Sequence, residues 1–321
     1  MHRLILRAAA LGLSFAALSA APAGAVDKLK VGKAVPEAFS FVPLDIGMKK
    51  GLFQKYGVEA ESVAFAGDAK MQQAMASNSI DIALGSGPAM AFIVKSSPIK
   101  GIAAMAGPPL LLTLVVRKDD TTIKTPADLK GKRVSVSTVG SLTYWLVSET
   151  SRQQGWGPDG IVIAPMGVAQ PQIAALKRKD IDGMVTDIST ALDLERSGDG
   201  RILMRFGDLV KDFHIHVIFA TNKDIAEKPE ALRNFLKGWF DTIRFMRANK
   251  AETVDIAKDV IQKDADNVSH TYDTLMPMFS DDGKFDPKAM AVLAKSYVEL
   301  KVLPTEPDPK ELIDDRFLPG K

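Results

Sequence analysis

Residues 80–87 read I-D-I-A-L-G-S-G, and residues 181–188, which lie 101 positions later, read I-D-G-M-V-T-D-I. At this offset Asp81 falls on Asp182, and the segments just before both stretches have a helical pattern. A helix, a tight turn, a buried strand and a small polar loop therefore occur twice in the same order. The repeat predicts two related lobes, each built around a strand that ends in a polar loop.

Strand and helix patterns alternate on both sides of these stretches. Apolar or alternating runs at 28–33, 58–65 and 133–138 predict strands, and turn residues separate them from the helical segments that follow. This alternation is typical of an α/β fold with a parallel sheet and helices on both faces. After residue 222 only helical patterns occur, which predicts a helical C-terminal block.

The first 25 residues differ from the rest in composition. Arg3 and Arg7 precede an apolar run, Ala8–Ala21, and Ala23-Gly24-Ala25 fits a signal-peptidase site. The run is shorter than the roughly 20 residues that a spanning helix needs. We therefore expect a secretory signal peptide cleaved after Ala25, and a mature protein that is soluble in the periplasm.

Charge and cysteine content exclude several classes of protein. Of the 41 Lys and Arg residues, two lie in the leader, so the mature chain balances 39 basic against 39 acidic residues. This balance gives a nucleic-acid partner no electrostatic support. The absence of cysteine excludes disulfides, thiol nucleophiles and cysteine-ligated metals. His214 and His216 supply too few ligands for a metal site, and we expect no metal or other cofactor.

Two strand-like segments flank the second copy of the repeat. Leu111–Arg117 precedes it and His214–Ala220 follows it, so we expect both to cross between the lobes as a hinge. The helical block would then pack back on the first lobe. The predicted domains are a signal peptide over 1–25, a discontinuous first lobe over 26–116 and 217–321, and a second lobe over 117–216.

Four segments of the mature chain occur in an order that is also found in a known protein family. They are F-V-P-L-D-I-G-M-K-K-G-L-F-Q-K-Y-G-V-E-A-E (41–61), G-D-A-K-M-Q-Q-A-M-A-S-N-S-I-D-I-A-L-G-S-G (67–87), T-P-A-D-L-K-G-K-R-V-S-V-S-T-V-G-S (125–141) and N-K-D-I-A-E-K-P-E-A-L-R-N-F-L (222–236). Together they resemble the substrate-binding proteins of bacterial ABC importers of the nitrate, sulfonate and taurine type, which are related to binders of the thiamine-pyrimidine precursor. The resemblance runs from about Lys28 to Leu303.

This resemblance implies the type II periplasmic-binding-protein fold, in which two α/β lobes close on a ligand. It implies that the protein captures a small molecule and delivers it to an ABC permease and its ATPase, without chemistry. We expect the protein to be a monomer. Eukaryotic relatives that build the thiamine pyrimidine carry a cysteine-rich motif, which this chain lacks. A ligand-sensing protein for a membrane receptor and an enzyme on the same fold remain alternatives.

The strand-end loops supply the candidate ligand contacts, because ligands of open α/β sheets bind beyond the carboxyl ends of the strands. In loop 138–143, free backbone N–H groups and a helix dipole would attract an anion, and the resemblance also places contacts there. For each loop the alternative is a helix cap or a core position without a ligand role. The candidates are Phe39, Ser40, Gly67, Asp68, Ser86, Gly87, Thr138, Gly140, Ser141, Thr143, Tyr144, Gly167, Asp187 and His214.

Asp187 bears most directly on the identity of the ligand, since it ends the second copy of the repeat where Ser86 ends the first. A carboxylate in a closing cleft repels anions and attracts cations or N–H donors, which would favour an amine-bearing or amino-heterocyclic ligand over nitrate. If Asp187 only caps a helix, sulfonates, taurine-like zwitterions, pyrimidine precursors and aromatic carboxylates all remain. The candidate loops contain no arginine, which argues against a bare oxyanion held by a guanidinium.

Overall fold

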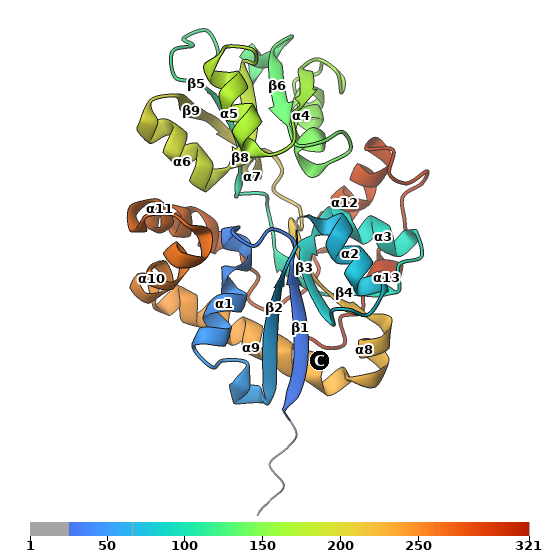
Figure 1. The fold of residues 1–321 in the computed structure, drawn as a ribbon. Helices are drawn as coiled ribbons and strands as arrows, with labels where there is room; N and C mark the ends of the chain where they lie inside the picture. The colour runs from blue at the N-terminus through green and yellow to red at the C-terminus, as the bar shows by residue number, and fades with distance from the viewer. Residues whose placement is uncertain (1–25, 66, 321) are drawn as a thin grey trace, which may run out of the picture.

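The computed structural model describes residues 26–65 and 67–320, so the predicted signal peptide lies outside the described residues. Within these ranges, ten strands form two five-stranded sheets, one in each lobe (Figure 1). The first sheet contains β1 (Asp27–Lys33), β2 (Val58–Ala64), β3 (Ile82–Ser86), β4 (Ile99–Ala106) and β10 (His216–Thr221). The second contains β5 (Leu112–Arg117), β6 (Arg133–Val136), β7 (Val162–Pro165), β8 (Gly183–Asp187) and β9 (Gly200–Arg205).

The two sheets share one topology. The strand order is β2-β1-β3-β10-β4 in the first lobe and β7-β6-β8-β5-β9 in the second. In each sheet the fourth strand is antiparallel to its neighbours and adjoins a crossing between the lobes, while the first three strands are parallel. Two α/β lobes built from matching units are therefore present, as the alternation of strand and helix patterns predicted.

The aspartate of each repeat copy has the same structural task. The carboxylate of Asp81 accepts a hydrogen bond from the backbone N–H of Lys30 at 2.7 Å, and that of Asp182 accepts one from Arg133 at 2.8 Å. In both lobes the aspartate just before the third strand of the sheet (β3 or β8) thus accepts a hydrogen bond from the backbone of the adjacent parallel strand (β1 or β6). The repeated Ile-Asp pair therefore makes the same contact between equivalent strands in both sheets, β1 with β3 and β6 with β8.

The hinge differs from our expectation. Residues 112–117 form β5, which pairs with β8 and β9, so this strand belongs to the second lobe and not to the first. Strand β10 likewise pairs within the first sheet. The chain crosses instead at 107–111 and 210–215, where Ile215 N–H donates to Gly107 O at 3.0 Å. A buried β-forming strand must have its backbone groups paired, and a sheet supplies those partners.

Short helices complete each lobe. The first lobe has α1 (Val42–Lys49), α2 (Asp68–Ala76) and α3 (Ala91–Val94), and the second has α4 (Leu142–Gln153), α5 (Ala169–Lys177), α6 (Ile188–Ser197) and α7 (Phe206–Leu209). Two 3-10 turns, η1 (Phe39–Phe41) and η3 (Gly87–Met90), follow β1 and β3. Helices α2 and α5 begin 101 residues apart, as do β3 and β8, so the sequence repeat is also a structural repeat.

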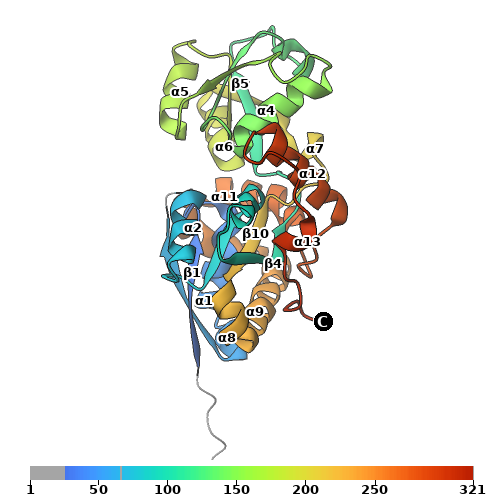
Figure 2. The same cartoon turned by 90° about the vertical axis from the view of Figure 1, so that its right-hand side faces the viewer.

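The C-terminal block is helical, as predicted, but it contacts both lobes. It consists of α8 (Asn222–Glu227), α9 (Pro229–Ala248), α10 (Lys250–Ile261), α11 (Ala265–Leu275), α12 (Pro287–Glu299) and α13 (Pro309–Leu312). Helix α11 packs against α6, and α12 rises beside α4 (Figure 2), where Trp145 Nε1 donates to Glu299 at 2.7 Å. No helix within 26–65 or 67–320 is long and apolar enough to cross a membrane.

Candidate functional site

A cleft between the lobes has two compartments that share a wall. The first, which we call the α4 compartment, has a volume of about 490 Å³ and lies between the N-terminus of α4 and the ends of β1 and β3. The second, the α6 compartment, has about 530 Å³ and lies between the N-terminus of α6 and η1 with α11. Four residues line both compartments, which are therefore adjacent: Val35, Phe41, Leu111 and His216.

The second lobe contributes a cluster of hydroxyl groups to the α4 compartment. Ser141 caps α4 by accepting a hydrogen bond from Tyr144 N–H, and its own hydroxyl donates to Thr138 O at 2.7 Å. Ser137 Oγ lies 3.0 Å from Ser141 Oγ and 2.9 Å from Thr143 Oγ1. Gly140 makes the turn possible, because its φ of +76° is in the left-handed region. Thr138, Gly140, Ser141 and Thr143 all line the compartment, as predicted, and contact with a ligand remains a prediction for each.

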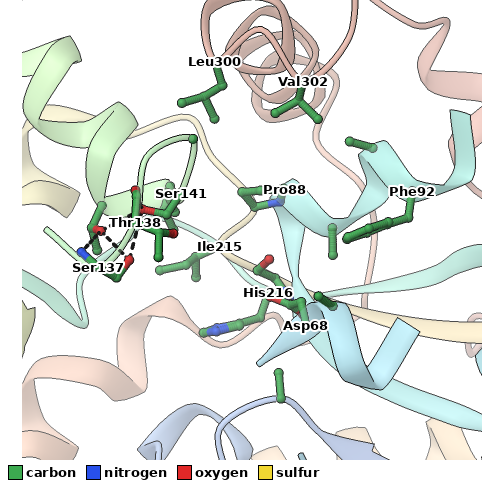
Figure 3. Close-up of a pocket in the computed structure, with 18 of the residues that line it drawn as sticks. Asp68, Pro88, Phe92, Ser137, Thr138, Ser141, Ile215, His216, Leu300 and Val302 are labelled. Carbon is green, nitrogen blue, oxygen red and sulfur yellow. Dashed lines mark hydrogen bonds between the residues drawn. The ribbon is translucent and has the colours of Figure 1, made fainter. Parts of the chain in front are cut away.

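The first lobe presents a carboxylate on the opposite wall (Figure 3). Asp68, the first residue of α2, accepts a hydrogen bond from Ser86 N–H at 3.0 Å, which joins the start of α2 to the end of β3. Burial raises the pKa of the Asp68 carboxyl, and the hydrogen bonds from Ser86 oppose that shift. Both residues line the α4 compartment, and no residue in the described ranges forms an ion pair with Asp68.

The histidine that reaches the cleft is His216, whereas we predicted His214. His214 lines a smaller cavity between the crossings and the segment before α12, and its Nε2 accepts from Asp286 N–H at 2.9 Å. Burial lowers the pKa of His214 to about 4. His216 opens β10, packs its ring edge-on against Phe41 at 4.9 Å between centroids, and has a buried Nδ1 without a partner among the described residues. Burial lowers its pKa to about 3, so the imidazole is neutral at physiological pH.

Asp187 is a helix cap that also lines the α6 compartment. Its two carboxylate oxygens accept from Thr190 N–H at 2.9 Å and from Thr190 Oγ1 at 2.7 Å. The alternative that we weighed from sequence therefore describes its bonding, although its charge still lies in the wall. Phe39 lines the same compartment, but it is buried and its ring packs against Tyr272 and Phe279, so it is mainly a core residue.

The other predicted contacts line neither compartment, and their positions have structural explanations. Ser40 is fully buried, and its hydroxyl has no partner among the described residues. Gly67 and Gly167 have positive φ angles at turns, and their N–H groups bond to Ala34 O and Ser137 O. Gly87 is buried against the second crossing. Tyr144 is half-buried and packs against the hydrophobic core. Their placement gives no support to direct ligand contact.

Sequence reasoning missed the apolar part of the wall. Phe92 from α3, Ile215 from the second crossing, and Leu300 with Val302 from the segment after α12 line the α4 compartment (Figure 3). Nothing local marks these residues as cleft residues, since they become neighbours only when the C-terminal block folds back over the first lobe. Within the described ranges no arginine lines either compartment, and Lys95 is the one lysine in the wall of the α4 compartment.

Comparison with known proteins gives a consistent picture. A family model described as "NMT1/THI5 like" matches residues 38–253. The taurine-binding periplasmic protein of Escherichia coli (strain K12) is 28% identical over 235 residues, which cover 71% of this chain and 68% of that protein.

Solved structures of similar fold include binding proteins and an enzyme. The periplasmic aliphatic sulphonate binding protein SsuA from Escherichia coli has a TM-score of 0.75 at 18% identity, covering 92% of this chain and 94% of that one. The desulfurization enzyme DSZB has a TM-score of 0.64 at 14% identity, covering 91% and 97%. The expected periplasmic-binding-protein fold is thus confirmed.

Proposed function

The chain belongs to the NMT1/THI5-like family, and from this premise we propose that it is the solute-binding component of an ABC import system. It would capture a small organic solute in the cleft between its lobes and deliver it to a membrane permease. One observation carries this proposal: matching strand-end loops of the two lobes, ending β3 and β8 and preceding α4, meet at one cleft of ligand size.

The cleft suits reversible capture. Its walls come from both lobes, and in the described ranges the chain passes between the lobes at 107–111 and 210–215, with further contacts from the C-terminal helices. A solute that touches both walls would stabilise the arrangement in which the lobes are together, because it binds that arrangement better than an open one. Release would follow when the permease favours separated lobes.

We place the mature protein in the periplasm, with the ABC permease and its ATPase as partners. The predicted leader supports export, and so does the periplasmic relative that covers 71% of this chain. We expect a monomer, because a single chain supplies both walls of the cleft.

A binding function is better supported than catalysis. The chain has no cysteine, which removes the strongest natural nucleophile. The described residues contain no group of His, Asp and Glu side chains that could hold a metal ion. His216 is neutral, and its Nδ1 has no hydrogen-bond partner among the described residues. Asp187 caps α6 by accepting from Thr190, so these two side chains do not form an acid–base pair. The solute would be sulfonate-, taurine- or pyrimidine-precursor-like.

Two measurements test this function. A thermal-shift screen of the mature protein against small organic solutes should find at least one that raises the melting temperature without being converted. Deletion of the gene should then abolish uptake of that solute, whereas a purely sensory protein would leave uptake intact. Turnover of a substrate, with no solute giving a thermal shift, would contradict the proposal.

A further inference from the structure

We infer, on the basis of the proposed function, that the solute combines a large apolar body with an amine or other N–H donor that faces Asp68. This inference narrows the solute classes proposed above, because taurine is a two-carbon zwitterion without an apolar body and alkanesulfonates are simple anions without an N–H donor. The inference rests on three features of the α4 compartment: its apolar walls, a carboxylate without a cation, and a neutral histidine beside that carboxylate.

The walls are mostly apolar, and the compartment is large. Its volume of about 490 Å³ lies within the range of roughly 300–1,000 Å³ that holds drug-sized ligands. Phe92, Ile215 and Leu300 come from three different parts of the chain and turn side chains toward the same space. A two-carbon zwitterion would leave these side chains facing water, whereas an aromatic or branched body would cover them.

Asp68 lies in this wall without a cationic partner. Its Oδ1 accepts from Ser86 N–H, and neither Lys95 nor any other basic residue in the described ranges forms an ion pair with it. A half-buried carboxylate that lacks a cation disfavours an anionic ligand and favours an ammonium or amino group. Charge-assisted hydrogen bonds of this kind are about twice as strong as neutral ones.

His216 does not compensate the negative charge of the Asp68 carboxylate. It pairs with Ser86 across the β3–β10 ladder, so it lies next to Asp68 on the same wall, as Figure 3 shows. Burial keeps its imidazole neutral, and no hydrogen bond to either ring nitrogen is formed by the described residues. A polar ligand atom would find a free neutral ring there, while a sulfonate would find no cation.

Asp187 does not have this role. Asp187 lines the α6 compartment and not the α4 compartment, and its oxygens accept from Thr190, so Asp68 is the carboxylate that faces the apolar walls of the α4 compartment. The preference for an amine that we considered for Asp187 from sequence is therefore assigned to Asp68, in the first lobe.

Three two-carbon probes separate the possibilities. Taurine carries an amine and a sulfonate, 2-phenylethanesulfonate replaces the amine by a phenyl ring, and 2-phenylethylamine replaces the sulfonate by a phenyl ring. Calorimetric titration of the mature protein should give 2-phenylethylamine a dissociation constant at least tenfold below those of the other two. A lower dissociation constant for taurine or for 2-phenylethanesulfonate overturns the inference.

Substitutions in the wall of the α4 compartment test whether Asp68 is the origin of the preference for the amine. Asp68→Asn keeps an oxygen that can accept from Ser86 N–H, so the variant should fold, and it should reduce the preference for the amine to less than threefold. Asp308→Asn, which alters an exposed helix cap outside the cleft, should keep the full preference. Leu300→Ala should weaken 2-phenylethylamine binding several-fold and leave taurine unchanged. An amine preference that survives Asp68→Asn refutes the assignment.

The inference and the proposed function can fail separately. If the solute screen finds a ligand that lacks either an N–H donor or an apolar body, the inference is wrong and the binding function stands. If no solute binds and none of the three probes does, both are wrong.

Discussion

Among the described glycines, Gly87 leaves the least room for a side chain. Its N–H donates to Ile215 O at 2.9 Å, and its carbonyl accepts from the Tyr297 hydroxyl at 3.0 Å. A Cβ at this position would lie 1.9 Å from His214 O and 3.2 Å from a methyl group of Leu293. The backbone of the second crossing must therefore move to admit even alanine.

Gly87→Ala should be strongly destabilising. Overpacking costs about 1–3 kcal/mol, and displacing the crossing also weakens the hydrogen bonds that Gly87 makes, each worth about 1 kcal/mol. We expect a loss of about 3 kcal/mol. With an unfolding entropy of about 2.1 cal/mol/K per residue, each kcal/mol lowers the melting temperature of a chain of about 300 residues by about 1.6 °C, so the melting temperature should fall by about 5 °C.

Thermal unfolding followed by circular dichroism measures this loss, and Gly107→Ala is the matched control. Gly107 lies in the other crossing, but a Cβ there would be 3.7 Å from Met278 O and 3.8 Å from Phe213 O, which is ordinary contact. That variant should stay within about 1 kcal/mol of the wild type. Equal melting temperatures for the two variants would refute the close approach of Gly87 to the crossing.

Three further expectations concern the wall and the lobe contacts. Asp187→Ala should cost about 1 kcal/mol of unfolding free energy as a lost cap and change the solute dissociation constant less than threefold; a tenfold loss would make its carboxylate a ligand contact. Burial lowers the pKa of His214 from 6.5 to about 4 and that of His216 to about 3. As the pH falls, the unfolded chain therefore protonates these two rings at a higher pH than the folded chain does. Urea unfolding should therefore show constant stability above about pH 6.5 and a fall toward pH 4 of at most about 1.4 kcal/mol per pH unit for each ring; a stability that does not fall between about pH 6.5 and pH 4 would contradict the burial of the two rings. Asn267→Ala removes buried hydrogen bonds to Ser189 O and Asp193 across the lobes, so unfolding should become easier by about 1–3 kcal/mol and small-angle scattering should show a larger radius of gyration; an unchanged radius would contradict its role in holding the lobes together.

Sequence reasoning predicted the elements with local signatures. The repeated Ile-Asp pairs predicted matching lobes. The structure supplies the physical reason, since each aspartate accepts a hydrogen bond from the neighbouring strand. Ser141 and Gly140 predicted the loop before α4, because a cap and a left-handed glycine are local requirements. The strand predicted over Leu111–Arg117 is present as β5, which begins one residue later, but its membership in the second sheet depends on partners far away in the sequence.

The parts of the site that sequence reasoning missed depend on tertiary packing. Sequence reasoning expected a strand over His214–Ala220 and chose His214 as the ligand contact, whereas β10 begins at His216 and the crossing before it places His214 against Asp286. Phe92 and Leu300 carry no local sign of exposure to a cleft, since the C-terminal block brings them together. Asp68 was a candidate from its loop, but its lack of an ion-pair partner is visible only in three dimensions.

The central claim is that the solute lies between the lobes, and blocking the cleft tests it most directly. Thr138 is exposed in the wall of the α4 compartment, so Thr138→Trp fills space there without disturbing the core, whereas its neighbour Val139 is 71% exposed and lines neither compartment. Isothermal titration with the solute that the screen identifies should give one site per chain in the wild type and in Val139→Trp, and no measurable binding in Thr138→Trp. An unchanged dissociation constant in Thr138→Trp would contradict the account.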